Sequence, residues 1–408
     1  MGSAYHLFYK NPVHLVKGEG VWLFDADGNK YLDMYNNVPH VGHCHPHVVE
    51  AIHKQAQLLN THTRYLHENV LNLAERLTAK TPGELDTAMF CCTGSESNEL
   101  AVRIARECTG GTGLIVTDFA YHGNTQATFE ISPESFPADK LPDYVTTVPE
   151  PDVYRGAHRG DDAAERYADY VRQALETFEQ RGVKPAAFVI DTISSCGGVV
   201  SPPPGYLSRV AEIIRDAGAL FIADEVQPGF GRTGTHFWGF EADGFVPDFV
   251  TTGKPMGNGH PLSAVVTRKD LVDKFSEQSD YFNTFGGNPV SCAAGLAVLD
   301  VIEEENLQQN ALDVGQHLFD GLWALAETKE CIGDVRGTGL FLAVELVTSR
   351  NERTPATALA SKVINDLRAN GVLTGSIGAD DNILKLRSPL VLSKDNADYF
   401  LGVLESVL

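Results

Sequence analysis

Lys254 is the residue whose surroundings first indicate covalent chemistry. It follows the strand-like segment DFVTTG (248–253) and precedes Pro255 in TTGKPMGNGHP, where further glycines predict tight turns. A lysine held in such a turn and removed from water loses its proton readily, and the neutral amine can form a Schiff base. Taken alone, an exposed loop lysine is the simpler interpretation.

Two acidic residues end another strand-like segment. The run ALFIADE (219–225) places Asp224 and Glu225 where a buried strand should stop. Because an unpaired carboxylate is costly to bury, a carboxylate here needs a partner. One candidate partner is Arg232, in a structural ion pair. The alternative is a cofactor nitrogen, which the carboxylate would keep protonated.

A third cluster opens a predicted helix. The segment CCTGSESNELAVRIAR puts Gly94 and Ser95 at the helix start, with Thr93 and Glu96 at the spacing of a capping box. Free backbone N–H groups, a hydroxyl and the positive end of the helix dipole would bind phosphate there, although an ordinary capped helix explains the same residues. The conjunction of this anion site with a strand-end aspartate and a strand-end lysine favours one shared site.

An alternating framework must bring these clusters together. Short β-branched runs predict strands over 113–118, 186–191, 219–225, 248–253 and 263–267. Apolar residues at spacings of three and four predict helices over 98–108, 163–180 and 206–218. This alternation predicts an α/β fold with a mainly parallel central sheet covered on both faces. Ligands bind such sheets at the carboxyl ends of the strands.

The two chain ends look different from the middle. Residues 20–35 read as a β-hairpin with Asp27-Gly28 at its turn, and a helix followed by short strands is expected after about Asn288. No Pro-rich or Ser-rich linker separates the ends from the centre. We therefore predict a large domain at 55–288 and a small α+β domain formed by 1–54 together with 289–408.

The composition excludes several classes of partner. Among 408 residues, 32 Lys and Arg stand against 54 Asp and Glu, a net charge of −22. This field repels nucleic acid and anionic membrane surfaces, and no segment approaches the roughly 20 apolar residues of a membrane span. Seven cysteines without a C-x-x-C pair, and an N-terminus without a secretory signal, predict a cytoplasmic protein.

Motifs spread over nearly the whole chain carry a family resemblance. They include GEGVWLFDADGNKYLD, GHCHP, CCTGSESNELAVRIAR, YHG, PPPGYL, IADEVQPGFGRTG and TFGGNPVSCAAG. Together they resemble the class III aminotransferases, fold-type I enzymes that use pyridoxal 5′-phosphate (PLP). The resemblance implies PLP as cofactor, with Lys254 bonded to it and Asp224 keeping the pyridinium nitrogen protonated.

The same resemblance implies the other cofactor contacts. Gln227 would lie near the ring hydroxyl, Tyr121 would stack on the ring with His122 beside it, and Gly94 with Ser95 would bind the cofactor phosphate. Thr284 of a neighbouring subunit would complete the phosphate site, which implies a homodimer with shared active sites. Whether dimers pair into tetramers stays open.

A histidine-rich motif raises the question of a metal. His43, Cys44, His45 and His47 have ligand-like spacing in GHCHP. This stretch is also an ordinary motif of the family that the chain resembles, so we predict no metal site.

Several departures from the aminotransferase pattern concern the substrate. The family arginine in R-x-x-P-P-L is Lys385 here, in KLRSPL, with Arg387 two residues later. Residues two apart on a strand share a face, so both cations could enter one pocket, although a solvated pair on an edge strand fits the spacing equally well. Asp191 stands where the family has glutamate, and NNVPHVGH adds Asn36, Asn37 and His40 near the mouth of the site.

The chain is similar to the ethanolamine-phosphate phospho-lyase branch of the family in a combination of motifs: NNVPHVGHCHP, SSCGG, GKPMGNGHP, YFNTFGGNPVSCAAGLAVLD and RTPATA. That similarity implies that O-phosphoethanolamine displaces Lys254 to form an external aldimine, that Lys254 then takes a proton, and that β-elimination expels phosphate. Acetaldehyde and ammonia would follow by hydrolysis. We expect a phosphate cage of Lys385, Arg387, Asn37 and Arg64 to hold the leaving group.

Two other functions stay open on the sequence. An ω-amine or amino-acid aminotransferase would use the same cofactor with a keto-acid acceptor. A PLP-binding protein without catalytic activity is disfavoured, because both Asp224 and Lys254 are present. A related lyase acting on phosphorylated hydroxylysine also stays open, because the sequence does not reveal the space beyond the amine.

Overall fold

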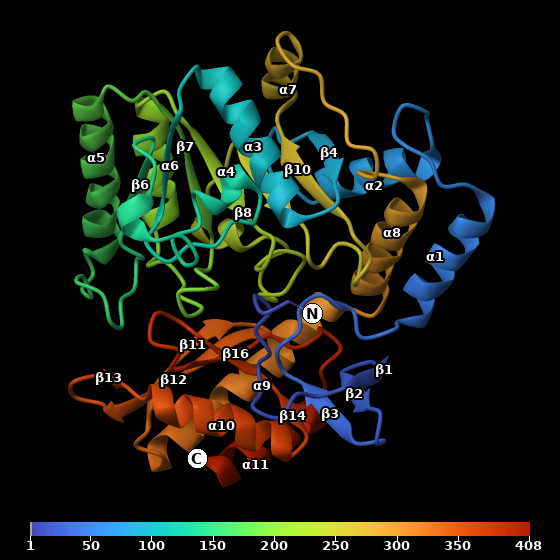
Figure 1. The fold of residues 1–408 in the computed structure, drawn as a ribbon, viewed down its shortest axis with the longest axis vertical. Helices are drawn as coiled ribbons and strands as arrows, with labels where there is room; N and C mark the ends of the chain where they lie inside the picture. The colour runs from blue at the N-terminus through green and yellow to red at the C-terminus, as the bar shows by residue number, and fades with distance from the viewer. Residues whose placement is uncertain (1) are drawn as a thin grey trace.

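The computed structural model describes residues 2–408, which form three sheets (Figure 1). The central sheet has seven strands, in the order β4 (Thr87–Cys91), β10 (Ser263–Thr267), β9 (Phe249–Thr252), β8 (Leu220–Asp224), β7 (Pro185–Asp191), β5 (Gly113–Thr117) and β6 (Val145–Val148). All five predicted strands belong to this sheet. The strands β4 and β6 were not predicted from the sequence.

The central sheet is mainly parallel, as predicted, but β10 runs antiparallel to both β9 and β4. The reason lies in the connection between β9 and β10. A parallel pair needs a long crossover, usually a helix, whereas residues 253–262 make only turns. The chain therefore reverses direction after β9, and these turns carry Lys254.

Helices cover the two faces of this sheet. Alternate strand residues divide between two apolar clusters. Ile115, Phe188 and Phe221 pack in the cluster that includes α5 (Ala163–Arg181) and α6 (Tyr206–Asp216). Leu114, Val189 and Ile222 pack with α3 (Gly94–Thr109) and α7 (Lys269–Ser276). The sheet is thus buried on both faces, which leaves its strand ends for ligands.

Both chain ends build the two smaller sheets, which lie together below the central sheet in Figure 1. One contains β1 (Leu15–Glu19), β2 (Trp22–Asp25), β3 (Lys30–Asp33) and β14 (Val372–Leu373). The other contains β11 (Ile332–Thr338), β12 (Phe341–Ser349), β13 (Thr354–Pro355), β16 (Ile383–Leu386) and β15 (Gly375–Ile377). The hairpin expected at residues 20–35 is β2 and β3.

The remaining helices join the ends to the centre. They are α1 (Pro46–Leu58), α2 (Glu68–Thr78), α4 (Gln126–Phe129), α8 (Pro289–Glu304), α9 (Leu307–Thr328), α10 (Thr357–Ala369) and α11 (Lys394–Val407), with short 3₁₀ turns at Ala138–Lys140 and Gly239–Asp243. Helix α8 packs against α1 and α2, across the boundaries predicted at 54/55 and 288/289. That domain division stays a prediction.

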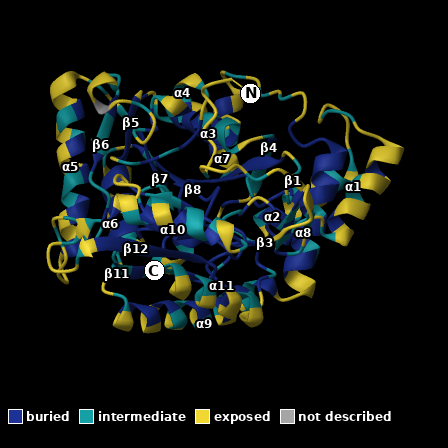
Figure 2. Cartoon of the chain, turned by 60° about the horizontal axis from the view of Figure 1, so that its bottom comes forward, coloured by how far each residue is buried: buried dark blue, intermediate teal, exposed yellow. Residues whose placement is uncertain are grey.

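The central strands are buried, and the helices around them expose one side to solvent. Figure 2 shows buried β7 and β8 in dark blue, whereas helices such as α1 and α9 turn yellow sides outward. Among residues 2–408, no helix combines the length and the apolar character needed to cross a membrane.

A core substitution tests how β8 is held. Phe221 is 0% exposed, and its ring lies 5.4 Å from that of Phe188 and 4.9 Å from that of Phe245. We expect Phe221→Ala to lower the free energy of unfolding by about 3–5 kcal/mol through lost burial and a cavity, measured by denaturant unfolding. Leu58→Ala, at an 80% exposed position, should change it by less than about 0.5 kcal/mol. Equal losses in the two variants would contradict the assignment of β8 to the core.

Candidate active site

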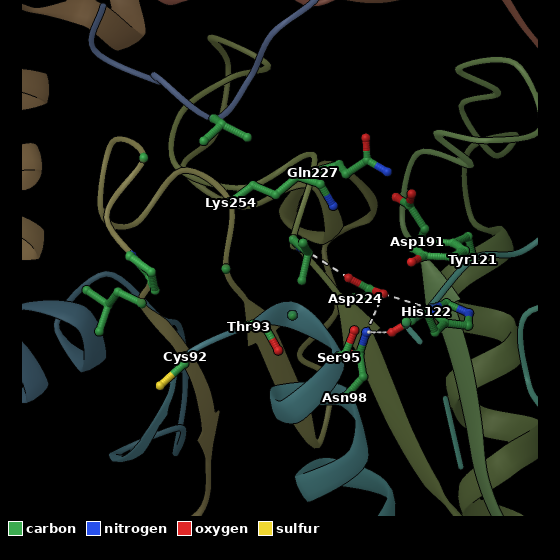
Figure 3. A pocket seen from close by; sticks show the side chains of 18 of the residues that line it. Cys92, Thr93, Ser95, Asn98, Tyr121, His122, Asp191, Asp224, Gln227 and Lys254 are labelled. Carbon is green, nitrogen blue, oxygen red and sulfur yellow. Dashed lines mark hydrogen bonds and ion pairs between the residues drawn. The ribbon is translucent and has the colours of Figure 1, made fainter. Parts of the chain in front are cut away.

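Four segments meet at the carboxyl edge of the central sheet. Asp224 ends β8, Asp191 ends β7, Lys254 follows β9, and α3 begins just after β4. They line a cavity of about 340 Å³, shown in Figure 3. Its wall contains Thr93, Gly94, Ser95, Asn98, Tyr121, His122, Asp191, Asp224, Gln227, Gly253, Lys254 and His260, among others. The three clusters found in the sequence therefore share one site.

Asp224 is fixed by three donors and is 4% exposed. Its Oδ2 accepts hydrogen bonds from Asn98 Nδ2 and from His122 Nδ1, each at 2.7 Å, and its Oδ1 accepts from the Val226 amide at 3.1 Å. Thr251 Oγ1 donates to Asn98 Oδ1 at 2.5 Å, which fixes the orientation of that amide. These bonds fix the orientation of the carboxylate. A cationic ring nitrogen fits this position.

The start of α3 forms a small-residue cradle. Thr93 and Glu96 make the expected capping box, and Ser95 Oγ accepts from the Asn124 amide at 3.1 Å. A Cβ on Gly94 would lie 3.0 Å from Val226, and one on Gly123 would lie 2.6 Å from Ser95 Oγ. Backbone N–H groups can therefore approach an anion closely here, as a cofactor phosphate requires.

Lys254 is half-buried in the turns after β9. The Met256 amide donates to the Gly253 carbonyl at 2.9 Å, which makes the predicted tight turn. Burial lowers the pKa of Lys254, as does the charge of Arg387, while Asp224 opposes the shift. A larger fraction of this amine is thus neutral at pH 7 than for an exposed lysine, as a nucleophile or base requires.

Lys385 and Arg387 come together beside Gln227. Lys385 Nζ donates to the Ser195 carbonyl at 2.8 Å and to Gln227 Oε1 at 3.3 Å. Arg387 Nε donates to the Tyr35 carbonyl at 3.3 Å. Burial and the neighbouring Arg387 lower the pKa of Lys385 to about 7. The alternative of a solvated surface pair is wrong, because Lys385 is 2% and Arg387 4% exposed.

The loop after β3 adds two buried side chains. Asn37 is 1% exposed, and its Nδ2 finds no partner among residues 2–408. His40 Nε2 donates to the Phe230 carbonyl at 2.7 Å, while its Nδ1 accepts from Arg232 at 3.1 Å. Burial lowers the pKa of His40, so this ring is neutral. His40 therefore anchors the loop, and the Asn37 amide is left with a free donor.

The proposed ion pair with Arg232 is wrong for both acidic residues. Arg232 Nη1 donates to the carbonyls of Leu340 and Ser388, both at 2.8 Å. Glu225 accepts instead from Thr192 Oγ1 at 2.5 Å and from the amides of Gly239 and Phe240 at 2.7 and 2.9 Å. Burial raises the pKa of Glu225 to about 8. A mostly neutral carboxyl explains why Glu225 needs no cation.

Two predicted site residues lie on an exposed face of the chain. Thr284 is exposed and lines a small pocket with Thr61 and His62. Arg64 is also exposed, and its guanidinium lies 4.1 Å from the centre of the Phe282 ring. Neither residue lines the cavity of its own chain among the residues described.

The histidines of GHCHP bond to separate carboxylates. His43 contacts Asp33 at 2.7 Å, His45 contacts Glu305 at 3.0 Å, and His47 contacts Asp300 at 3.0 Å. Cys44 is an exposed free cysteine. Over residues 2–408, no group of three or more His, Cys, Asp or Glu side chains is arranged to hold a metal ion.

Two functional residues were missed in the sequence. Asn98 holds Asp224, and Ser195 offers its carbonyl to Lys385. The helical position of Asn98 gave a usable signal, because a polar residue one turn into a buried helix needs a buried partner. A backbone carbonyl carries no such signal, so the contact of Ser195 required the structure.

Comparison with known proteins places this chain in a family. A family model described as aminotransferase class-III matches residues 6–408. The alanine–glyoxylate aminotransferase 2-like protein of Drosophila melanogaster is 44% identical over 412 residues, covering 98% of this chain and 83% of that protein. Ethanolamine-phosphate phospho-lyase homolog 1 of Caenorhabditis elegans is 42% identical over 426 residues, covering 100% of this chain and 91% of that protein.

A solved structure agrees in fold as well as sequence. The phospholyase from Arthrobacter in complex with phosphoethanolamine superposes with a TM-score of 0.96 at 44% identity, covering 100% of this chain and 96% of that one. The chain belongs to the class III aminotransferase family, has the fold-type I architecture, and is a PLP-dependent enzyme. The family resemblance, the fold class and the cofactor predicted from the sequence are thereby confirmed.

Asn98 offers a test of how Asp224 is held. We expect Asn98→Ala to weaken PLP binding about ten-fold, because Asp224 loses a donor and turns away from the ring nitrogen. Absorbance titration of the apoprotein with PLP measures this. Thr251→Val removes the bond that orients Asn98 but keeps the Asn98 donor, so it should weaken PLP binding less. If Asn98→Ala binds PLP as tightly as the unaltered protein, Asn98 does not position Asp224.

Proposed function

We propose that this enzyme is a phospho-lyase that eliminates phosphate from O-phosphoethanolamine and yields acetaldehyde and ammonia after hydrolysis. The observation that carries the proposal is the buried pair of cations at Lys385 and Arg387, which neighbours the cavity and has no carboxylate within ion-pair distance among residues 2–408. Two buried positive charges without a counter-ion call for an anionic ligand. The likeness to a phospholyase that binds phosphoethanolamine supports this choice.

The cavity residues fit PLP. Asp224 would bind the ring nitrogen, Gly94 and Ser95 would bind the phosphate at the start of α3, and Tyr121 and His122 would contact the ring. His122 Nε2 is buried without a partner among the residues described, so it can bond to such a group. PLP supplies an electron sink for the carbanion that forms next to nitrogen.

The protein itself moves one proton and holds one leaving group. Lys254 Nζ, whose pKa is lowered by burial, would take the proton from the carbon that bears nitrogen. The electron pair left on that carbon forms a double bond to the neighbouring carbon as the C–O bond to phosphate breaks. Lys385 and Arg387 would orient that phosphate, and the free Asn37 Nδ2 is a third donor for it.

We propose that Arg64 and Thr284 serve the site of a second copy of this chain. The two residues share one exposed face, because Arg64 packs on Phe282, two residues before Thr284. This face also carries Phe285, 70% exposed, and Tyr65, 66% exposed. Exposed aromatic side chains are enriched at protein interfaces. A homodimer would cover them.

Product analysis tests the proposed reaction against the aminotransferase alternative. With phosphoethanolamine we expect release of inorganic phosphate, and no alanine when pyruvate is added. Lys254→Ala should lower kcat by a factor of about 10³ or more, because the base is lost. Alanine formed from pyruvate without phosphate release would overturn the lyase assignment in favour of an aminotransferase. The unaltered protein loaded with PLP and incubated without amine is the control.

The charge of Lys385 predicts a pH dependence. Because its pKa lies at about 7, Lys385 is cationic below that pH and neutral above it. Inorganic phosphate, used as a competitive inhibitor, should bind roughly ten-fold more weakly at about pH 8.5 than at about pH 7.

Lys385→Arg provides the matched control for that dependence. Arginine stays charged throughout this range, so phosphate binding to this variant should depend less on pH. Phosphate itself ionises in the same way with both proteins, so the difference between the two profiles reports the charge of residue 385. The double variant Lys385→Ala with Arg387→Ala should raise KM for phosphoethanolamine. An unchanged KM would remove both residues from the phosphate cage.

A further inference from the structure

The ammonium of Lys385 is aimed mainly by one backbone oxygen. Its 2.8 Å bond to the Ser195 carbonyl is shorter than its 3.3 Å bond to Gln227 Oε1. An ammonium group has three donors, and no third acceptor lies within bonding distance among the residues described. The direction of the free N–H is therefore set by where the Ser195 carbonyl points.

That carbonyl belongs to a turn organised by Asp191. Asp191 Oδ2 accepts from the Ser195 amide at 3.0 Å, and its Oδ1 accepts from the Ile193 amide at 3.3 Å. The Ser194 amide donates to the Asp191 carbonyl at 3.1 Å. Both carboxylate oxygens of Asp191 are thus engaged by the turn, although the residue lines the cavity.

Other contacts hold the rest of the segment independently. Ser194 Oγ donates to Glu150 Oε1 at 2.6 Å, and Arg336 Nε donates to the Gly198 carbonyl at 2.8 Å. The Gly378 amide donates to the Cys196 carbonyl at 3.1 Å. Loss of the Asp191 carboxylate should therefore rotate the peptide at Ser195 without releasing residues 192–199 as a whole.

We propose that Asp191 is a positioning residue for phosphate recognition, acting through the Ser195 carbonyl to aim Lys385 at the substrate phosphate. It does not bind the substrate itself, because the turn uses both of its oxygens. This inference rests on the proposed function, since it requires Lys385 to bind phosphate.

A double-mutant cycle on the PLP-loaded enzyme tests whether Asp191 acts through Lys385. The probe is inorganic phosphate, and its Kd is measured by calorimetry for the unaltered protein, Asp191→Ala, Lys385→Met and the double variant. We expect Asp191→Ala to raise the Kd about ten-fold. In the Lys385→Met background the same change should add nothing, because the ammonium that Asp191 aims is gone.

Control variants separate positioning from general damage. Asp118→Asn alters an exposed carboxylate just after the neighbouring strand β5 and should leave the Kd unchanged. The cofactor absorbance spectrum and the melting temperature should stay close to those of the unaltered protein in Asp191→Ala. If Asp191→Ala fails to fold, Asp191→Asn keeps one acceptor oxygen and should show an intermediate Kd.

The outcomes distinguish the inference from the function on which it rests. If Lys385→Met leaves the Kd unchanged, Lys385 is not a phosphate ligand and the proposed cage fails. If Lys385→Met weakens binding but Asp191→Ala does not, the cage stands and the positioning role of Asp191 is overturned. Additive losses in the double variant would also overturn it, because Asp191 would then act by a route other than Lys385.

Discussion

The site depends on keeping Lys385 and Arg387 buried beside the half-buried Lys254, with no ion-pair partner for any of the three among residues 2–408. Burial lowers the pKa values of Lys254, Lys385 and Arg387, and the charge of Arg387 lowers those of the two lysines further. Carbonyl oxygens stabilise two of them, through Ser195 for Lys385 and Tyr35 for Arg387. Such acceptors offset desolvation without cancelling charge. Lys254 on the cavity wall and Lys385 behind Gln227 thus lie on the substrate side, while the Asp224 carboxylate faces the cofactor side.

This constraint explains why the chain folds its two ends against the central sheet. The Asp224 carboxylate lies at the end of β8 in the central sheet. Lys385 lies in β16 of a smaller sheet, and Arg387 directly follows that strand. Arg232 ties the parts together, because it donates to the Ser388 carbonyl and to His40 Nδ1. All of these acceptors of the Arg232 guanidinium are neutral, so Arg232 does not draw Asp224 or Glu225 into an ion pair.

Much of this arrangement follows from local sequence patterns, and the rest depends on distant contacts. The strand ends at Asp224 and before Lys254 were predictable because β-branched runs and glycine-rich turns are local signals. The capping box at Thr93 is equally local. The antiparallel direction of β10 was missed because it depends on the absence of a crossover helix between β9 and β10, which no local pattern in residues 253–262 reveals. The Glu225 contact was misjudged because burial made the carboxyl largely neutral, a property that no spacing reveals.

The overall charge and the local charge have opposite signs, and this difference bears on selectivity. With a net charge of −22, the protein surface repels anions, so a phosphate gains favourable interactions only once it reaches the buried cations. There it would relieve the repulsion from Arg387 that lowers the pKa of Lys385. A neutral substrate of the same size would leave that repulsion in place. Discrimination between phosphorylated and unphosphorylated amines can thus arise from the unpaired charge itself, in addition to the hydrogen bonds that the phosphate accepts.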